Sequence, residues 1–143
     1  MNQKKTIELP SPAPCFDVLL SPTPRGARLA RLLAVDWLRT LGLPYRVTQA
    51  AEQIVAELAA NAATHGRVSG RGFRLALLAG TDALRIEVTD TRGEDLPLLS
   101  TAAPDASSGR GLVLVEGLAD RWGVGLGPAP RKTVWVELNL PRC

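Results

Sequence analysis

The chain has 143 residues, of which 45% are hydrophobic, enough to fill one core of ordinary size and indicating one domain. Its 17 basic and 14 acidic side chains leave a net charge of +3 with the two signs interspersed, so charge alone does not indicate direct binding to nucleic acid. The apolar runs are far shorter than the roughly 18 residues of a membrane span, and the two cysteines lack metal-ligand spacing. We therefore expect a soluble cytoplasmic protein.

The beginning of the chain predicts a flexible segment, a strand and a helix. Residues 1–14 carry three prolines and little periodicity, so we expect a flexible N-terminal segment followed by one domain over 15–143. The apolar run at 15–20 is typical of a strand. Apolar residues recur at helical spacing over 24–41, and Thr23 stands where an N-cap is needed.

The middle of the chain predicts a second helix and a hairpin. Apolar residues at helical spacing place the helix over 48–65. Two short runs rich in Leu, Ile and Val at 73–80 and 84–90 are joined by a turn and indicate two antiparallel strands. Residues 91–108 hold two prolines and no sustained period, and a connection of that length is a candidate lid.

The last part of the chain predicts a third helix and a second hairpin. The helix is expected directly after the glycine-rich stretch 109–111, and the strands are expected at 122–126 and 133–140. The strands are therefore mostly antiparallel neighbours, and the helices must cover one face of the sheet. This order predicts an α+β fold built as a two-layer sandwich.

Three polar residues share one face of the second predicted helix. Glu57, Asn61 and His65 are spaced by four and stay within about 80° of one another around the helix axis. One interpretation is an ordinary polar outer face. The histidine would then lie near the C-terminal end of the helix, where the helix dipole favours a cation. The other is a site in which Asn61 supplies an oxygen to Mg²⁺ and Glu57 acts as a base. The spacing leaves both interpretations open.

Two further stretches have the character of a ligand site. Asp90 closes an apolar strand, where its carboxylate either accepts a hydrogen bond from an exocyclic amine such as that of adenine or simply opens a turn. Gly109 and Gly111 stand just before the third helix, where free backbone N–H groups favour an anion and Arg110 adds charge. The alternative for this second stretch is a plain helix cap.

Taken together and in this order, the motifs resemble the Bergerat ATP-binding fold of gyrase, Hsp90, histidine kinases and MutL. "ELAANAATH" resembles the N box of that family, "DTRG" its first glycine box, "GRGL" its second, and "KTVWVEL" its closing strand. A chain of this size is most similar to the anti-sigma-factor serine kinases of the RsbW and SpoIIAB type. The resemblance implies ATP and Mg²⁺ as cofactors, and a sigma factor and an anti-anti-sigma protein with a STAS domain as partners.

The resemblance also implies residue roles. Glu57 would take the proton of the substrate hydroxyl, and Asn61 would bind Mg²⁺. Asp90 would bind the adenine amine, aided by Thr133 through a water molecule. His65 matches a frequent polar position of the N box, and no chemistry follows for it.

The two glycine boxes would hold the rest of the nucleotide. Gly93 belongs to the first box, and Gly109 and Gly111 of the second would leave backbone amides free for the phosphates. Arg110 lies between them and would add a positive charge to the phosphate site.

The sequence departs from the family pattern at two places. The first glycine box usually has the form D-x-G-x-G, and Arg92 and Glu94 occupy its two glycine positions. In the related kinases an arginine two residues before the second box approaches the γ-phosphate, and Ser107 stands there in this chain. Arg110 is the nearest substitute. Phosphoryl transfer needs that cation more than adenine binding does.

Three hypotheses follow. The leading one is an ATP-binding anti-sigma regulatory factor with serine/threonine kinase activity toward an anti-anti-sigma partner. The alternative is a non-catalytic partner-switching module with a degenerate nucleotide site. The third, a basic domain acting on DNA, has only the basic isoelectric point in its favour. Whether the chain forms a homodimer, as such relatives often do, is left open.

Overall fold

The computed structural model describes residues 13–64, 71–90, 106–126 and 131–141. Along the chain the elements are β1 (Cys15–Leu20), α1 (Pro24–Arg39), α2 (Tyr45–Thr64), β2 (Phe73–Ala79), β3 (Ala83–Asp90), α3 (Ala106–Leu118), β4 (Arg121–Leu126) and β5 (Lys132–Asn139). The predicted order of strands and helices is confirmed. Within these ranges no helix combines the length and apolar character needed to cross a membrane.

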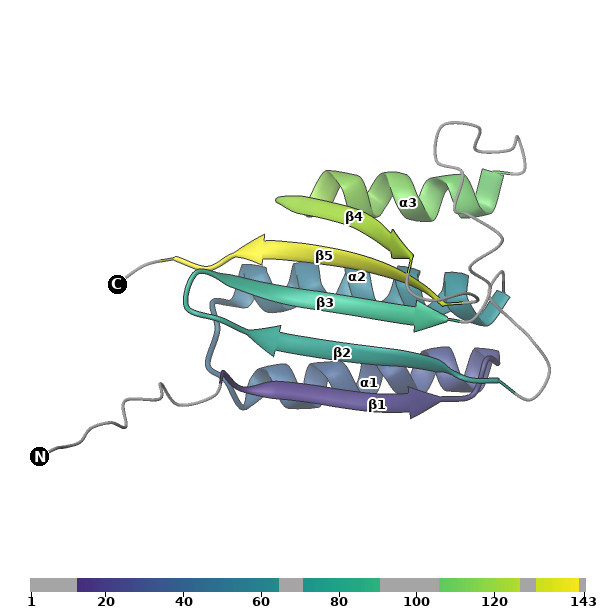
Figure 1. Ribbon diagram of the computed structural model, residues 1–143. Helices are drawn as coiled ribbons and strands as arrows, with labels where there is room; N and C mark the ends of the chain where they lie inside the picture. Colours follow the sequence, from purple (N-terminus) through teal and green to yellow (C-terminus); the bar gives the residue numbers. More distant parts are fainter. Residues whose placement is uncertain (1–12, 65–70, 91–105, 127–130, 142–143) are drawn as a thin grey trace, which may run out of the picture.

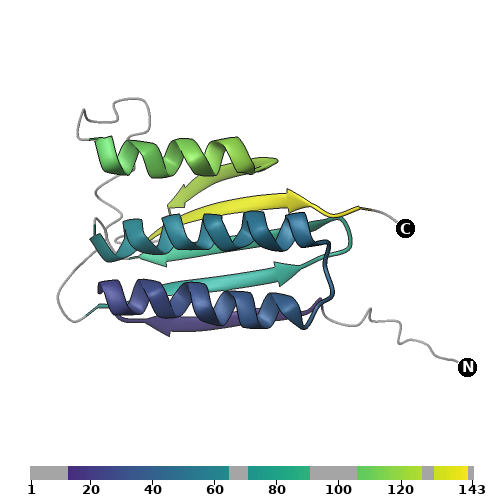
Figure 2. The ribbon, with the colours of Figure 1, turned by 180° about the vertical axis from the view of Figure 1, so that it is seen from behind.

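The strands form one antiparallel sheet in the order β1-β2-β3-β5-β4. The three helices cover one face of this sheet, with α2 between α1 and α3 (Figures 1 and 2). No described helix or strand covers the other face, which we call the open face. The predicted two-layer α+β sandwich is therefore confirmed.

The core lies between the helices and the covered face of the sheet. Side chains alternate along the strands, so that Leu84, Ile86 and Val88 of β3 are buried while the residues between them face outward. The residues that α2 contributes to this core are spaced as the sequence predicts, namely Val47, Ala51, Ile54, Val55, Leu58, Ala59 and Ala62. Burying such side chains is worth about 1.5–3 kcal/mol for each large one.

The ends of the first two helices differ slightly from the predictions. Thr23 caps α1 as expected, since its Oγ1 accepts a hydrogen bond of 3.0 Å from the amide of Gly26. The helix ends at Arg39, two residues before the predicted end, and the chain leaves through Gly42, whose φ of 66° suits glycine. α2 begins at Tyr45, three residues earlier than predicted, because the carbonyl of Pro44 accepts the first helical hydrogen bonds.

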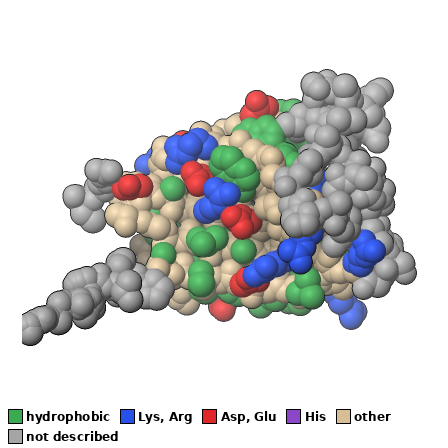
Figure 3. Space-filling model, viewed as in Figure 1, with side chains coloured by type: hydrophobic (Ala, Val, Ile, Leu, Met, Phe, Trp, Pro, Cys, Tyr) green, Lys and Arg blue, Asp and Glu red, His purple; other side chains and the backbone are tan. Residues whose placement is uncertain are grey.

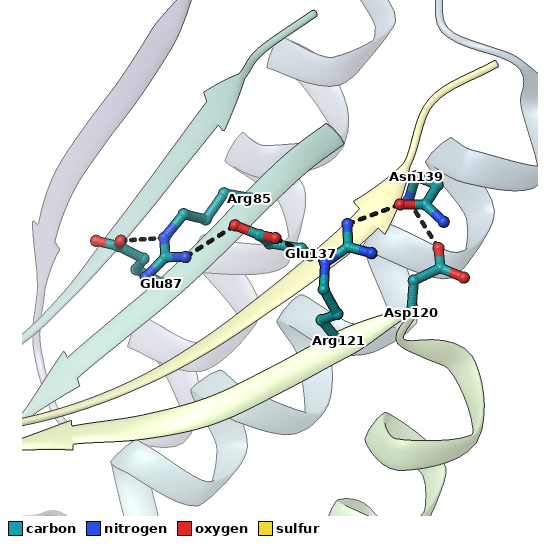
Figure 4. Close-up of polar contacts among 6 residues, drawn as sticks. All are labelled: Arg85, Glu87, Asp120, Arg121, Glu137 and Asn139. Atoms are coloured by element: carbon teal, nitrogen blue, oxygen red, sulfur yellow. Dashed lines mark hydrogen bonds and ion pairs between the residues drawn. The ribbon is translucent and has the colours of Figure 1, made fainter. Parts of the chain in front are cut away.

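The open face of the sheet carries a network of charged side chains (Figures 3 and 4). Glu137 of β5 lies at its centre and accepts hydrogen bonds of 2.9 Å from both Arg85 and Arg121. Arg85 also donates to Glu87 at 2.6 Å, and its guanidinium lies 4.6 Å from the centre of the Trp135 ring. Hydrogen bonds from the two arginines hold the pKa of the Glu137 carboxyl below its ordinary value, and the bond from Arg121 has the largest effect.

Candidate functional site

Four of the elements meet at one end of the molecule. The C-terminal ends of α2 and β3 and the N-terminal ends of α3 and β5 all lie at that end (Figure 1). These elements carry every site residue that the sequence predicts within the described ranges. The structure therefore gathers motifs that are far apart in the chain into one region.

Glu57 and Asn61 both lie on α2 and are half-buried. Their direction follows from Glu52 of the same helix, which forms an ion pair of 2.8 Å with Arg31 of α1. Asn61 is nine residues from Glu52, which is about 180° around an α-helix. Asn61, and Glu57 one turn before it, therefore lie on the side of α2 away from α1, toward α3 (Figure 2).

Asp90 is the last residue of β3 and is only 5% exposed. Residues two apart along a strand share a face, so Asp90 points to the helix-covered side together with Val88 and Ile86. A buried carboxylate at this end of the strand has the position that the sequence predicts for binding a base.

Lys132 lies in the candidate site, and the sequence analysis did not single it out. It lies directly opposite Asp90 in the register of β3 and β5, on the same face of the sheet. Its Nζ lies 3.4 Å from Oδ2 of Asp90, and both side chains are less than one-tenth exposed. The alternation of Val134, Val136 and Leu138 in the same strand was the available signal, because Lys132 shares their face.

The structure does not bring Thr133 and Asp90 together on one face of the sheet. Thr133 is paired with Thr89 in the sheet, and their two hydroxyl oxygens lie 2.7 Å apart on the open face. Successive residues of a strand point to opposite faces, so Thr133 is turned away from Asp90 by the pleat. β5 begins one residue earlier than predicted, at Lys132, and this residue takes the inward position.

The second glycine box lies within α3, whereas the sequence analysis predicted it just before the helix. α3 begins at Ala106, so Ser107, Gly109, Arg110 and Gly111 are all helical. A glycine in a helix costs only about 1 kcal/mol relative to alanine, so two glycines did not mark the start of this helix. The side chain of Arg110 lies outside the described part of the structure.

Several predicted features lie outside the described residues. They are His65, Arg92, Gly93 and Glu94, together with residues 91–105 of the candidate lid predicted over 91–108, whose last three residues belong to α3. Among the residues that are described, no group of three or more His, Cys, Asp or Glu side chains is arranged to hold a metal ion. Asn61 is the Mg²⁺ ligand that the sequence analysis predicts, and Mg²⁺ in nucleotide sites usually takes its other ligands from phosphates and water.

A surface hollow of about 370 Å³ lies away from this region. It is formed where α1 ends and α2 begins, and Leu38, Leu43 and Tyr45 are among its lining residues. The candidate site is at the opposite ends of both helices (Figure 1). The hollow therefore has no part in it.

The chain matches the model of the histidine kinase-like ATPase domain over residues 20–136. This match covers most of the sequence, so the chain belongs to that family. Among solved structures it is similar to "the RsbU and RsbW domains of Rv1364c from Mycobacterium tuberculosis", with 22% identity and a TM-score of 0.66. The similarity covers 92% of this chain and 34% of that one, and it shows a shared fold. No curated protein matches the chain.

Proposed function

We propose that the protein is an ATP-binding anti-sigma regulatory factor that phosphorylates a serine or threonine of an anti-anti-sigma partner. Its partners are then a sigma factor and a protein with a STAS domain. Membership of the ATPase-domain family supports nucleotide binding. The similarity to a structure that contains an RsbW domain supports the regulatory class.

The observation that carries the proposal is the burial of Asp90 at the end of β3, on the helix-covered face. An acidic side chain in such a place is costly unless it is paired or receives hydrogen bonds. Asn61 and Glu57 lie on the adjacent helix, on its side toward α3. One nucleotide laid across this end of the molecule would be within the reach of β3, α2 and the first turns of α3.

The residues of the chain have separate tasks in this proposal. Asp90 accepts a hydrogen bond from the base, and the side-chain oxygen of Asn61 holds Mg²⁺. Bound Mg·ATP supplies the phosphoryl group and leaves as Mg·ADP. Glu57 takes the proton from the substrate hydroxyl while the oxygen of that hydroxyl forms the bond to phosphorus. The first four residues of α3, of which Gly109 is the last, lie at the positive end of the helix, where phosphates are favoured.

Calorimetric titration with Mg·ATP tests the nucleotide site. We expect saturable binding by the wild-type protein and loss of binding in Asn61→Ala. Gln53→Ala is the matched control, because it removes an amide from an exposed position of the same helix and should bind normally. Absence of binding by the folded wild-type protein would overturn the proposal.

Phosphoryl transfer to a STAS-domain protein tests the catalytic part. We expect Glu57→Gln to bind Mg·ATP normally and to transfer phosphate about 10²–10⁴ times more slowly, the usual contribution of a general base. Equal rates in the two proteins would remove Glu57 from the chemistry.

A second function is a non-catalytic partner-switching module, and the ion pair between Asp90 and Lys132 favours it. A lysine beside the base-binding carboxylate changes the site that the family resemblance implies. In this case Glu57→Ala leaves regulation of the partner intact. A variant that folds but no longer regulates its partner would argue for the kinase.

A further inference from the structure

The ion pair of Asp90 and Lys132 gives the base end of the site two opposite charges on one face. Lys132 lies opposite Asp90 in the register, its Nζ is 3.4 Å from the carboxylate, and both side chains are almost completely buried. Burying two charges costs free energy that a small neutral side chain at position 132 would not require. The two buried charges therefore restrict which ligands can bind at the base end of the site.

A ligand that contacts both groups must match both. The carboxylate of Asp90 only accepts hydrogen bonds, and the ammonium of Lys132 only donates them. The base must thus present a donor beside an acceptor. Adenine meets this with its exocyclic amine and the neighbouring ring nitrogen. Guanine meets it with its ring N–H and exocyclic amine on one side and its carbonyl oxygen on the other.

Guanine gains more from the lysine than adenine does. Its carbonyl oxygen is a strong acceptor for an ammonium group, and lysine is a common partner of this atom in protein–DNA contacts. Its two donors also match the two oxygens of a carboxylate. The positive charge of Lys132 competes with the donors of either base for the same carboxylate, so the difference between the bases lies in the acceptor that each offers to the ammonium group.

We propose that Lys132 is a specificity-determining residue that weakens the preference of the site for adenine over guanine nucleotides. This proposal rests on the proposed nucleotide-binding function, because it requires that the base contacts Asp90. Lys132 acts on the base end alone and takes no part in binding Mg²⁺ or in proton transfer.

The experiment is a pair of calorimetric titrations, with Mg·ATP and with Mg·GTP, on the wild-type protein and on Lys132→Thr. We expect the wild-type protein to bind both nucleotides. In Lys132→Thr the ratio of the two dissociation constants should shift toward ATP by about tenfold, as expected for loss of one specific contact to the base. Arg131→Thr is the matched control, because it removes the same charge from the neighbouring exposed residue and should leave the ratio unchanged.

Thermal melting shows whether each variant is folded. Removing Lys132 leaves a buried carboxylate without this cation, so Lys132→Met, which retains an unbranched side chain of similar length, replaces Lys132→Thr where the latter unfolds. A nucleotide ratio that is the same in the folded variant and in the wild type would overturn the role of Lys132 and leave the nucleotide site intact. Absence of binding of either nucleotide to all the folded proteins would overturn both proposals.

Discussion

The hydroxyl oxygens of Thr89 and Thr133 lie 2.7 Å apart on the open face of the sheet, one residue from the Asp90–Lys132 pair on the covered face. The two pairs are neighbours in the same register and lie on opposite faces of the sheet. We therefore expect Thr133→Val to bind nucleotide as the wild type does and to lose about 1 kcal/mol of stability with its hydrogen bond. Titration with Mg·ATP and urea denaturation measure the two effects.

The comparison variant for Thr133→Val is Asn61→Ala, for which the proposed site predicts loss of nucleotide binding. If Thr133→Val instead lost binding while remaining folded, the base would have to contact the open face of the sheet. That result would contradict the assignment of Asp90 and Lys132 to the base end of the site.

Much of the architecture could be predicted because it follows from local periodicity. The alternation of apolar residues in β3 and the helical spacing of those in α2 each depend on neighbouring residues only. The same alternation in β5 could have placed Lys132 inward and Thr133 outward. The family resemblance pointed to Thr133 as the residue near the base instead, because a match of residue types does not show to which face of the strand a side chain points.

Other features of the site depend on contacts between distant segments and could not be predicted. The pairing of Asp90 with Lys132 requires the register of two strands that are separated by α3 and β4 along the chain. The side of α2 on which Asn61 lies follows from the packing of α1, through the ion pair of Arg31 and Glu52. The start of α3 at Ala106, by contrast, could have been predicted, because Asp105, a residue type favoured at the N-cap, directly precedes it in the sequence.

Gly123 of β4 allows the indole ring of Trp135 to lie against the strand. A Cβ at this position would lie 2.8 Å from a ring carbon of Trp135, too close for either group to remain in place. We expect Gly123→Ala to destabilise the protein by about 1–3 kcal/mol, the usual cost of overpacking. Urea denaturation at neutral pH measures this difference.

Gly125 supplies the control for Gly123. It lies two residues further along β4, on the same face, and among the described residues no atom lies within 4 Å of a Cβ placed there. Gly125→Ala should therefore fold with at least the stability of the wild type, since alanine reduces the entropy of the unfolded chain. Equal destabilisation by both substitutions would mean that the ring of Trp135 is free to move.

The side chain of Thr23 stabilises the beginning of α1 by accepting a hydrogen bond from the amide of Gly26. Thr23→Ala removes this acceptor and should cost about 1 kcal/mol. Thr23→Ser keeps the hydroxyl and should retain most of the stability. Thermal denaturation of the two variants decides the point, and equal losses in both would attribute the effect to the methyl group of threonine.

Glu137 makes the stability of the protein depend on pH at the acidic end. Hydrogen bonds from Arg121 and Arg85 lower the pKa of its carboxyl in the folded state below that in the unfolded chain. The stabilisation is therefore complete above the ordinary pKa of glutamate and is lost as the pH falls through the lowered value. We expect Glu137→Gln to cost about 1 kcal/mol at neutral pH, because ion pairs near the surface are screened by solvent.

The difference in unfolding free energy between the wild type and Glu137→Gln should shrink as the solution is acidified. Asp17 has a lowered pKa as well, through its hydrogen bond with Arg74, but this contribution is common to both proteins and cancels. Glu116→Gln removes the same charge from an exposed position of α3 and controls for net charge. A difference that stayed constant through the acidic range would mean that the two arginines do not hold Glu137 in its charged form, and the loss would then come from packing alone.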